Sequence, residues 1–215
     1  MNEIVVHGIP GSPFVRAVQL TLEEKTLPYR LNALGPGDLR SEAHLRQHPF
    51  GRVPAFAHGD FALYETRAIL RYLDAAFPDP ALQPTDAAGL GRMEQIMAIN
   101  DWYFFPKVAA VIVFNRIVGP VFRGITPDEA AIAAAMPMAV TCLAELGRFL
   151  GDQPFLVGDR VSLADLLLAP QVDFLAAKPE WQDLLRGTVL SAWLTRMNER
   201  PSMQRTQRPA MLRGT

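Results

Sequence analysis

The sequence predicts an α/β domain with a mixed sheet, followed by an all-α domain, and three observations carry this prediction. Residues 1–77 alternate short strand-like and helix-like stretches in the order βαβ-ββα. Residues 78–87 contain three prolines and no hydrophobic periodicity, which is typical of a linker. Residues 88–215 have helical periodicity and almost none of the alternation that marks strands.

The apolar pattern of the first domain justifies its elements one by one. Val15, Val18 and Leu22 form one stripe of a helix. Two apolar stretches around the turn at 58–60 predict a β-hairpin. The expected elements are a strand at 4–6, a helix at 14–25, a strand at 29–33, the hairpin at 53–64 and a helix at 66–77. A helix between the first two strands implies that they are parallel, and the hairpin adds antiparallel strands, so the sheet is mixed.

The second domain has one sharp local signal, the stretch SLAD at 162–165. Ser162 is a natural N-cap, and the Asp165 carboxylate can reach back to the Ser162 amide. A serine and an aspartate also suggest catalysis, but capping explains the spacing, so we assign both residues to folding. The expected helices cover 88–118, 127–150, 162–177, 181–186 and 188–198.

Composition excludes several classes of protein. The 21 basic and 22 acidic residues balance, which argues against a nucleic acid as the main partner. The longest apolar run, 108–114, is far shorter than the roughly 20 residues of a membrane span. The early acid in MNEIVVHG is unlike a signal peptide, and the single cysteine, Cys142, precludes an internal disulfide. We therefore expect a cytoplasmic protein with no membrane or nucleic-acid partner, and a solvated or folded-back C-terminal tail.

Four stretches resemble motifs of the cytosolic glutathione transferases, and they occur along the chain in the same order as in that family. HPFGRVPAF (48–56) is similar to the family's NPFGQVPAL, and YETRAIL (64–70) is similar to its ESRAI stretch. GDRVSLAD (158–165) and WLTRMNERPSMQR (193–205) resemble its second-domain capping motif and its C-terminal end. The resemblance implies a thioredoxin-like N-terminal domain, glutathione as co-substrate, no metal, and a homodimer. SPFVR (12–16) resembles the serine-type subfamilies, and the choice among delta, theta, phi and tau stays open.

The resemblance assigns two parts of glutathione to two short segments. It places a cis proline at Pro54, which leaves the Val53 amide and carbonyl free to pair with the cysteinyl backbone, as a strand pairs with an extended peptide. The alternative is a proline that only starts an edge strand. Glu65 and Thr66 lie where a strand becomes a helix, and free amides there suit the γ-glutamyl carboxylate. Thr66 replaces the family's usual serine and keeps its hydroxyl, while the Glu65 carboxylate can accept from the γ-glutamyl ammonium.

The glycine carboxylate of glutathione has two candidate partners, Arg40 and Arg52. Either guanidinium can make a charge-assisted hydrogen bond to a carboxylate. Arg52 stands where the family commonly has glutamine, and a solvated surface arginine is an equally good interpretation of each alone. His44 and His48 flank the same loop and receive little weight, because a lone surface histidine usually has no such role.

Ser12 is the residue that the resemblance implies is catalytic. The thiol of glutathione is a poor nucleophile, and a hydroxyl hydrogen bond together with a helix N-terminus stabilises the thiolate. The Ser12 oxygen can accept from a helix amide while its proton is donated to sulfur, so capping and catalysis are compatible. The first strand offers no tyrosine, and Cys142 is too distant in sequence to replace it.

The second substrate is expected to meet an apolar wall. Phe14 follows Ser12, and Met97, Trp102 and Tyr103 lie in the aromatic-rich stretch 93–106. A stripe of core or dimer contacts is an equally good interpretation of each. The neighbouring Asp101, or Asn100 beside it, is expected to reach the γ-glutamyl amine bound in the other subunit.

The main prediction is a homodimeric glutathione transferase that adds the glutathione thiolate to a hydrophobic electrophile. The same fold also supports glutathione-dependent peroxidase, dehalogenase or isomerase activity. A non-catalytic glutathione-binding or adaptor protein is the alternative from another class. The electrophile, the subfamily and the pathway stay open from the sequence.

Overall fold

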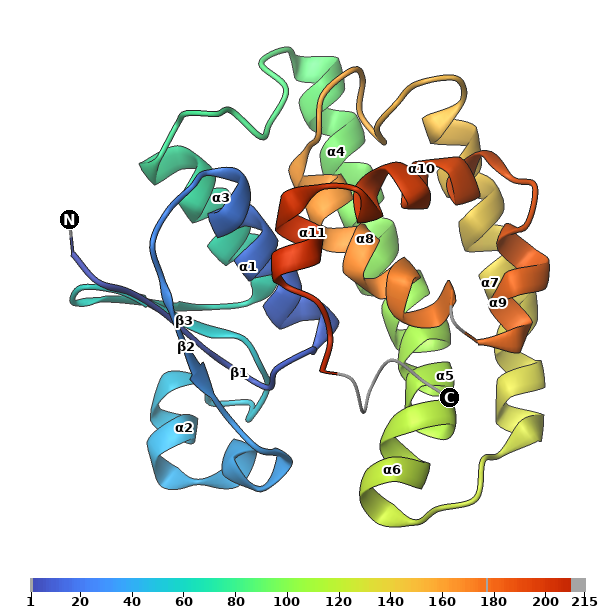
Figure 1. Ribbon diagram of the computed structural model, residues 1–215, viewed down its shortest axis with the longest axis horizontal. Coiled ribbons are helices and arrows are strands. Elements are labelled where there is room, and N and C mark those ends of the chain that lie inside the picture. The colour runs from blue at the N-terminus through green and yellow to red at the C-terminus, as the bar shows by residue number, and fades with distance from the viewer. Residues whose placement is uncertain (1, 177, 210–215) are drawn as a thin grey trace.

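A mixed four-stranded sheet organises the first domain of the computed structural model, which describes residues 2–176 and 178–209 (Figure 1). The strand order is β2-β1-β3-β4. The strands are β1 (Ile4–Gly8), β2 (Arg30–Ala33), β3 (Ala55–His58) and β4 (Phe61–Tyr64). β1 pairs parallel with β2 and antiparallel with β3, and β3 pairs antiparallel with β4. The predicted mixed sheet and fold class are therefore confirmed, and the domain is thioredoxin-like.

Helices lie on both sides of this sheet. α1 (Pro13–Glu24) and α3 (Thr66–Ala76) lie between the sheet and the second domain, and α2 (Glu42–Gln47) lies on the other side (Figure 1). The sequence missed α2 and the short 3-10 helix η1 (Pro36–Arg40) before it. Each is too short to show an apolar stripe. α2 is fixed instead by a cap, because the Ser41 hydroxyl accepts from the His44 amide at 3.2 Å.

The second domain is helical in the described residues, as predicted. A continuous run comprises α4 (Ala87–Ile99), the π-helical η2 (Asn100–Ala109), α5 (Ala110–Val113), the π-helical η3 (Phe114–Val118) and α6 (Gly119–Arg123). It extends beyond the expected end at 118. The other helices are α7 (Glu129–Leu150), α8 (Leu163–Ala176), α9 (Pro179–Leu185), α10 (Val189–Asn198) and α11 (Pro201–Arg205).

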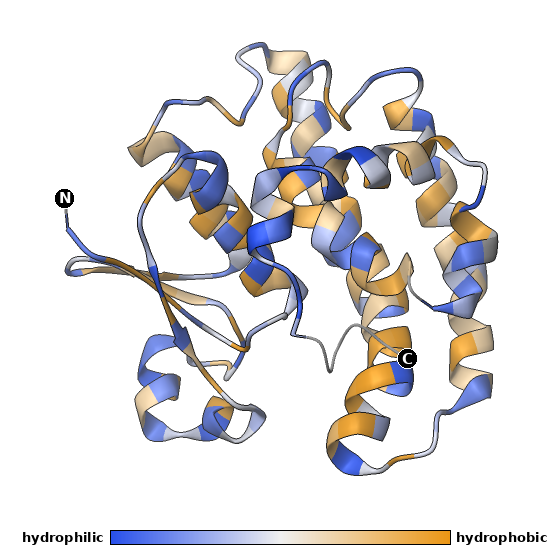
Figure 2. Ribbon diagram, viewed as in Figure 1, coloured by the Kyte–Doolittle hydropathy of each residue, from blue (hydrophilic) through white to orange (hydrophobic). Residues whose placement is uncertain are grey.

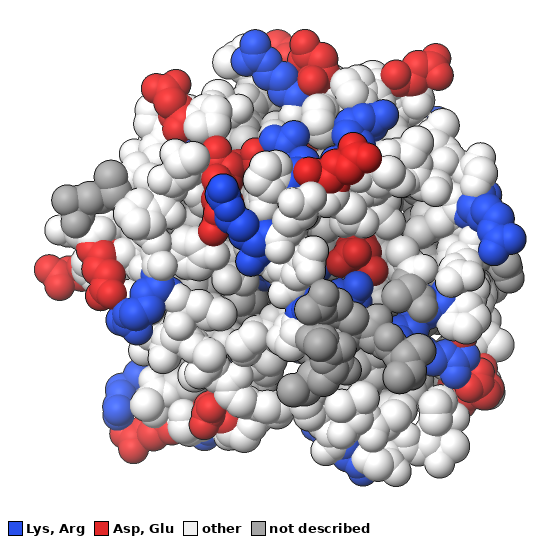
Figure 3. Space-filling model, viewed as in Figure 1, with Lys and Arg blue, Asp and Glu red and all other residues white. Residues whose placement is uncertain are grey.

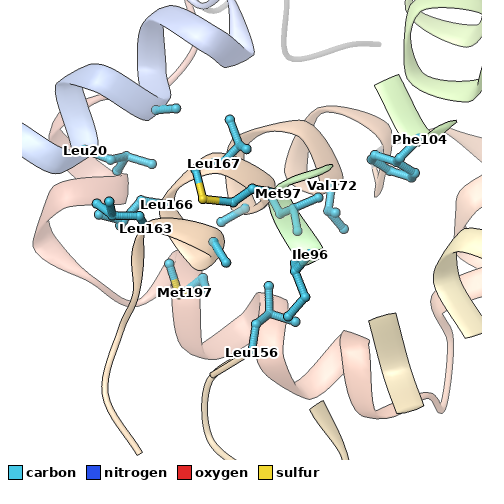
Figure 4. Packing of buried hydrophobic residues seen from close by; sticks show 14 of the residues in the cluster. Leu20, Ile96, Met97, Phe104, Leu156, Leu163, Leu166, Leu167, Val172 and Met197 are labelled. Atoms are coloured by element: carbon cyan, nitrogen blue, oxygen red, sulfur yellow. The ribbon is translucent and has the colours of Figure 1, made fainter. Parts of the chain in front are cut away.

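α8 is the centre of the molecule. Nearly all of its side chains are buried, and α1, α4 and α10 pack around it. Figure 4 shows the resulting core, in which Leu20 of α1 and Met97 of α4 lie near Leu166 and Leu167 of α8. The core is thus continuous across both domains, and this fixes the direction of α1.

The SLAD motif forms the turn that starts α8. The Ser162 amide donates to Asp165 Oδ2 at 2.9 Å, and the Ser162 hydroxyl donates to the same oxygen at 2.7 Å. Asp165 Oδ1 also accepts from the Leu156 amide at 2.9 Å and from Trp193 Nε1 at 2.8 Å. Burial raises the pKa of Asp165, and these donors oppose that rise. The hydrogen bonds of Ser162 and Asp165 therefore support the structural role that the sequence assigns to both residues.

The surface is of mixed polarity. Lys and Arg are interspersed with Asp and Glu on the face shown in Figure 3. Figure 2 shows apolar residues along the 87–123 run and along α7, two helical segments long and apolar enough to cross a membrane. These segments pack on each other here, and apolar side chains such as Met93, Ile112 and Leu146 are buried in the core. Their apolar character therefore has an explanation within this fold.

Candidate active site

A groove of about 540 Å³ lies where the first domain meets the second. Five segments form it: the loop from β1 into α1, the short helix η1, the turn from α2 into β3, the junction of β4 with α3, and the first turns of η2. Its lining residues are Ser12, Phe14, Leu39, His48, Gly51, Arg52, Val53, Pro54, Glu65, Thr66, Arg67, Asp101 and Phe105. The groove thus brings together side chains from distant parts of the sequence.

Ser12 occupies the N-cap position of α1, with Pro13 as the first helical residue. Its carbonyl accepts from the Arg16 amide at 2.9 Å, as an N-cap carbonyl does. The hydroxyl, however, makes no capping hydrogen bond, so that part of the prediction is wrong. Within the described residues the Ser12 hydroxyl has no partner, and its proton is free to be donated to a ligand in the groove.

Val53 and Pro54 form the middle of the groove. Their peptide bond is cis. The backbone amide and carbonyl of Val53 have no hydrogen-bond partner in the part of the chain that the structure describes, because β3 starts only at Ala55. Val53 therefore presents a donor and an acceptor to an extended peptide.

Glu65 and Thr66 form one end of the groove. Glu65 has a positive φ of 70°, an uncommon conformation for a residue other than glycine and one that occurs often at functional sites. Thr66 is the first residue of α3, and its side chain is buried. The first amides of a helix have no intrahelical partner and attract anions, so this end suits a carboxylate.

The arginines differ in position. Arg52 lines the groove and is exposed, whereas Arg40 does not line it. The Arg40 guanidinium instead lies against Gly51, where a Cβ would be 3.0 Å from its Nη1. Arg52 is the better placed of the two for a carboxylate in the groove.

Arg67 also lines the groove, next to Thr66, and was not among the residues predicted from the sequence. Its Nη1 lies 3.2 Å from Asp101 Oδ2, and its Nη2 pairs with Glu94. Asp101 also accepts from Asn100 Nδ2 at 3.0 Å. Asp101 lies in the wall of its own groove, and its contact with the other subunit's ligand stays a prediction. Arg67 was detectable only as the residue after the matched Glu-Thr pair.

The apolar end consists of Phe14 and Phe105, whose ring centroids are 4.4 Å apart. The other three residues predicted for the hydrophobic substrate site do not line the groove. Met97 is fully buried in the core, so it cannot line a substrate site. Trp102 and Tyr103 are 71% and 47% exposed and lie outside the groove lining. The helical turn of η2 places Phe105, four residues after Asp101, on the groove side instead.

Comparisons with known proteins identify the family of both domains. Residues 6–81 match the glutathione S-transferase N-terminal domain, and residues 129–196 match the glutathione S-transferase C-terminal domain. A glutathione S-transferase of Hyoscyamus muticus is 32% identical over 92% of this chain and 94% of its own length. The chain belongs to the glutathione S-transferase family. The crystal structure of glutathione transferase F7 from Populus trichocarpa superposes on this family member with a TM-score of 0.86, at 25% identity, covering 99% of this chain and 100% of that one.

A second solved glutathione S-transferase was determined with its ligand. The theta class enzyme from Xanthomonas axonopodis pv. citri with glutathione bound has a TM-score of 0.81 and is 28% identical, covering 98% of this chain and all of that one. The predicted family is thus confirmed, and the subfamily stays open, since plant and theta class proteins both match.

Three further observations concern this glutathione S-transferase. Burial lowers the pKa of His48 below its usual 6.5, against the opposing effect of the Glu65 charge, so the imidazole in the groove wall is neutral at pH 7. A larger hollow of about 640 Å³ lies between the linker and the end of α7, and no predicted glutathione-binding residue lines it. Across residues 2–176 and 178–209, no three His, Cys, Asp or Glu side chains form a metal-ligand group.

Proposed function

We propose that this glutathione S-transferase holds glutathione in the groove and stabilises its thiolate with the hydroxyl of Ser12. The observation that carries the proposal is the unpartnered Ser12 hydroxyl at the N-cap of α1, facing the same groove as the free backbone groups of Val53. A hydroxyl donor and a helix N-terminus both favour a negatively charged sulfur. Positioning and thiolate stabilisation together constitute the mechanism.

Each part of the tripeptide has a partner with matching chemistry. The cysteinyl backbone pairs with the amide and carbonyl of Val53. The γ-glutamyl carboxylate accepts from the first amides of α3 and the Thr66 hydroxyl, and its ammonium donates to Glu65. The glycine carboxylate pairs with Arg52, with Arg40 behind Gly51 adding positive charge.

The electrophile occupies the apolar end, against Phe14 and Phe105. These rings lie in the same groove as Ser12, so a hydrophobic substrate is held next to the sulfur. Closing this end with apolar groups also removes water from the thiolate and strengthens its interaction with the hydroxyl. The reaction is addition or displacement by sulfur at that electrophile.

The proposal includes a cytoplasmic homodimer. The support for the dimer is a set of exposed aromatic side chains, Phe50, Tyr64, Trp102 and Tyr103. A second copy of this chain covers them in the proposal. Analytical ultracentrifugation tests it: a single monomeric species at micromolar concentration contradicts the dimer.

The test of the central proposal is the ultraviolet absorbance of bound glutathione thiolate against pH, in wild type, Ser12→Ala and Ser12→Thr. Wild type is expected to ionise the thiol well below the usual range of a free thiol. Ser12→Ala should raise that pKa by at least about one unit, or about 1.4 kcal/mol, and Ser12→Thr, which keeps the hydroxyl, should raise it less. A depressed pKa that survives Ser12→Ala would assign the role to a main-chain amide. No binding of glutathione at all would favour the adaptor.

A further inference from the structure

His44 is not the surface histidine that the sequence suggested. Its side chain is only 3% exposed, in α2 behind the groove. Its Nε2 lies 2.8 Å from the carbonyl oxygen of Arg52. A carbonyl only accepts hydrogen bonds, so Nε2 carries the proton and donates it. The other ring nitrogen, Nδ1, is buried and has no hydrogen-bond partner among the described residues.

The hydrogen bond acts on the peptide unit that the groove uses. The carbonyl of Arg52 and the amide N–H of Val53 belong to one planar, trans peptide unit, in which they point in opposite directions. Fixing the direction of the carbonyl toward α2 therefore fixes the direction of the Val53 N–H toward the groove. The Val53 N–H is the donor assigned above to the cysteinyl carbonyl.

His44 also holds the other end of the same turn. Its own carbonyl accepts from the His48 amide at 2.8 Å, and the His48 carbonyl accepts from the Gly51 amide at 2.8 Å. The rings of His44 and His48 are stacked with centroids 6.2 Å apart. One residue thus restrains the turn 48–52 at its start through its backbone and at its end through its side chain.

The far side of the turn is equally restricted. Gly51 has a φ of +59°, and a Cβ there would lie 2.7 Å from the Leu39 carbonyl oxygen. The turn therefore packs directly on η1 at Gly51. The Nε2 hydrogen bond of His44 then holds the Arg52 carbonyl, one residue further along the chain.

From these contacts we propose that His44 is a positioning residue for glutathione, acting through the Arg52 carbonyl to aim the Val53 amide at the cysteinyl backbone. The inference rests on the proposed function. It assigns His44 no contact with the ligand and no part in thiol ionisation. Loss of the donor therefore weakens glutathione binding without changing the chemistry of bound glutathione.

The experiment compares His44→Leu, which removes the donor, with His44→Gln, whose side-chain N–H reaches about as far as Nε2. Calorimetry with reduced glutathione should show Kd about tenfold higher in His44→Leu, the equivalent of about 1.4 kcal/mol. His44→Gln should bind within about threefold of wild type. The KM for glutathione should follow Kd, while kcat at saturating glutathione and the pKa of the bound thiol stay at their wild-type values.

His58→Leu is the matched control. It also removes a histidine hydrogen bond, that of Nδ1 with the Tyr72 hydroxyl at 2.8 Å, but it lies outside the groove lining. Its glutathione Kd should equal that of wild type. If His44→Leu does not fold, His44→Asn replaces it, since the shorter amide cannot reach the carbonyl. Asn binding glutathione as tightly as Gln would overturn the inference.

The outcomes separate this inference from the proposed function. If the wild type binds glutathione and His44→Leu binds it with the same Kd, the positioning role is refuted, and the proposed mechanism of Ser12 is unaffected. A tenfold loss in Kd together with a raised thiol pKa also refutes it, because the defect then reaches the chemistry. A wild-type protein that binds no glutathione refutes the proposed function itself, and the inference with it.

Discussion

Lys25 provides the sharpest test of how the two domains are joined. Its side chain is fully buried at the end of α1, and its ammonium has three donors. Nζ donates to the Phe77 carbonyl oxygen at 2.6 Å and to that of Pro80 at 2.8 Å, and it forms an ion pair with Asp74 Oδ1 at 2.7 Å. Replacing Lys25 with Met, which has a similar volume, removes the charge and leaves the Asp74 carboxylate and two linker carbonyls without these donors.

The expected loss in the free energy of unfolding depends on the partners that Asp74 keeps in Lys25→Met. Removing one partner of a buried ion pair costs about 3–5 kcal/mol, because the other charge stays buried. Asp74 keeps two donors, the Leu82 amide at 2.9 Å and Gln83 Nε2 at 2.7 Å. We therefore expect the free energy of unfolding to fall by about 3 kcal/mol, the lower end of this range. For a chain of this length, that corresponds to a fall in Tm of roughly 6–12 °C.

Urea unfolding followed by tryptophan fluorescence measures the loss for Lys25→Met. Lys107→Met is the matched control, because Lys107 is exposed and lies 5.2 Å above the Tyr103 ring. It should cost less than about 1 kcal/mol. The double variant Lys25→Met, Asp74→Asn should recover part of the loss, since it removes the unpaired charge. A loss below about 1 kcal/mol for Lys25→Met would refute the reasoning.

Three further predictions concern folding. Gly8→Ala should lower the free energy of unfolding by about 1–3 kcal/mol, because the new Cβ would lie 2.3 Å from Val15 Cγ2; adding Val15→Ala should reverse the loss in urea unfolding. Burial raises the pKa of Glu24, but hydrogen bonds led by Arg200 outweigh it and hold the pKa below 4.5. The stability from Glu24 is therefore present above pH 4.5 and lost as the pH falls through the folded-state pKa, and Glu24→Gln should flatten that part of the Tm–pH profile. In Asp165→Asn, the new side-chain NH2 group faces the N–H and O–H groups that donate to the carboxylate in the wild type. The free energy of unfolding measured in urea should therefore fall by about 3 kcal/mol, and an unchanged value would contradict this.

The sequence predicted the elements whose apolar pattern is long enough to see. The mixed sheet, α1, α3 and most helices of the second domain have such patterns, whereas α6 and α11 have five residues each and were not predicted. α2 has only six residues, and its cap involves a side chain that no periodicity reveals. The continuation of the 87–123 run past Val118 was missed for another reason. Gly119 and Pro120 predict a break, yet proline is tolerated at the start of the new helical segment α6.

Site prediction depended on which segments carried motifs. Ser12, Val53 and Thr66 lie in matched stretches, and the structure brings them to one groove. Met97 and Trp102 were chosen by residue type on a helix that the resemblance places beside the groove. The side chains of a helix point in all directions, and here Met97 points into the core and Trp102 into solvent. His44 was undervalued because its burial comes from α2, the element that the pattern did not show.

Ser12 owes its free hydroxyl to the way α1 is held. A catalytic hydroxyl must be fixed in place yet keep its proton available, and a side-chain hydrogen bond that fixes it would also occupy it. In this protein, contacts elsewhere along α1 hold the helix, and the Ser12 side chain takes no part in them. One turn after Ser12, Arg16 pairs with Asp173 of α8 at 2.8 Å, and at the other end of the helix Glu24 binds Arg200. The backbone of α1 therefore places the hydroxyl at the groove, and in the proposed mechanism its single proton is donated to the sulfur.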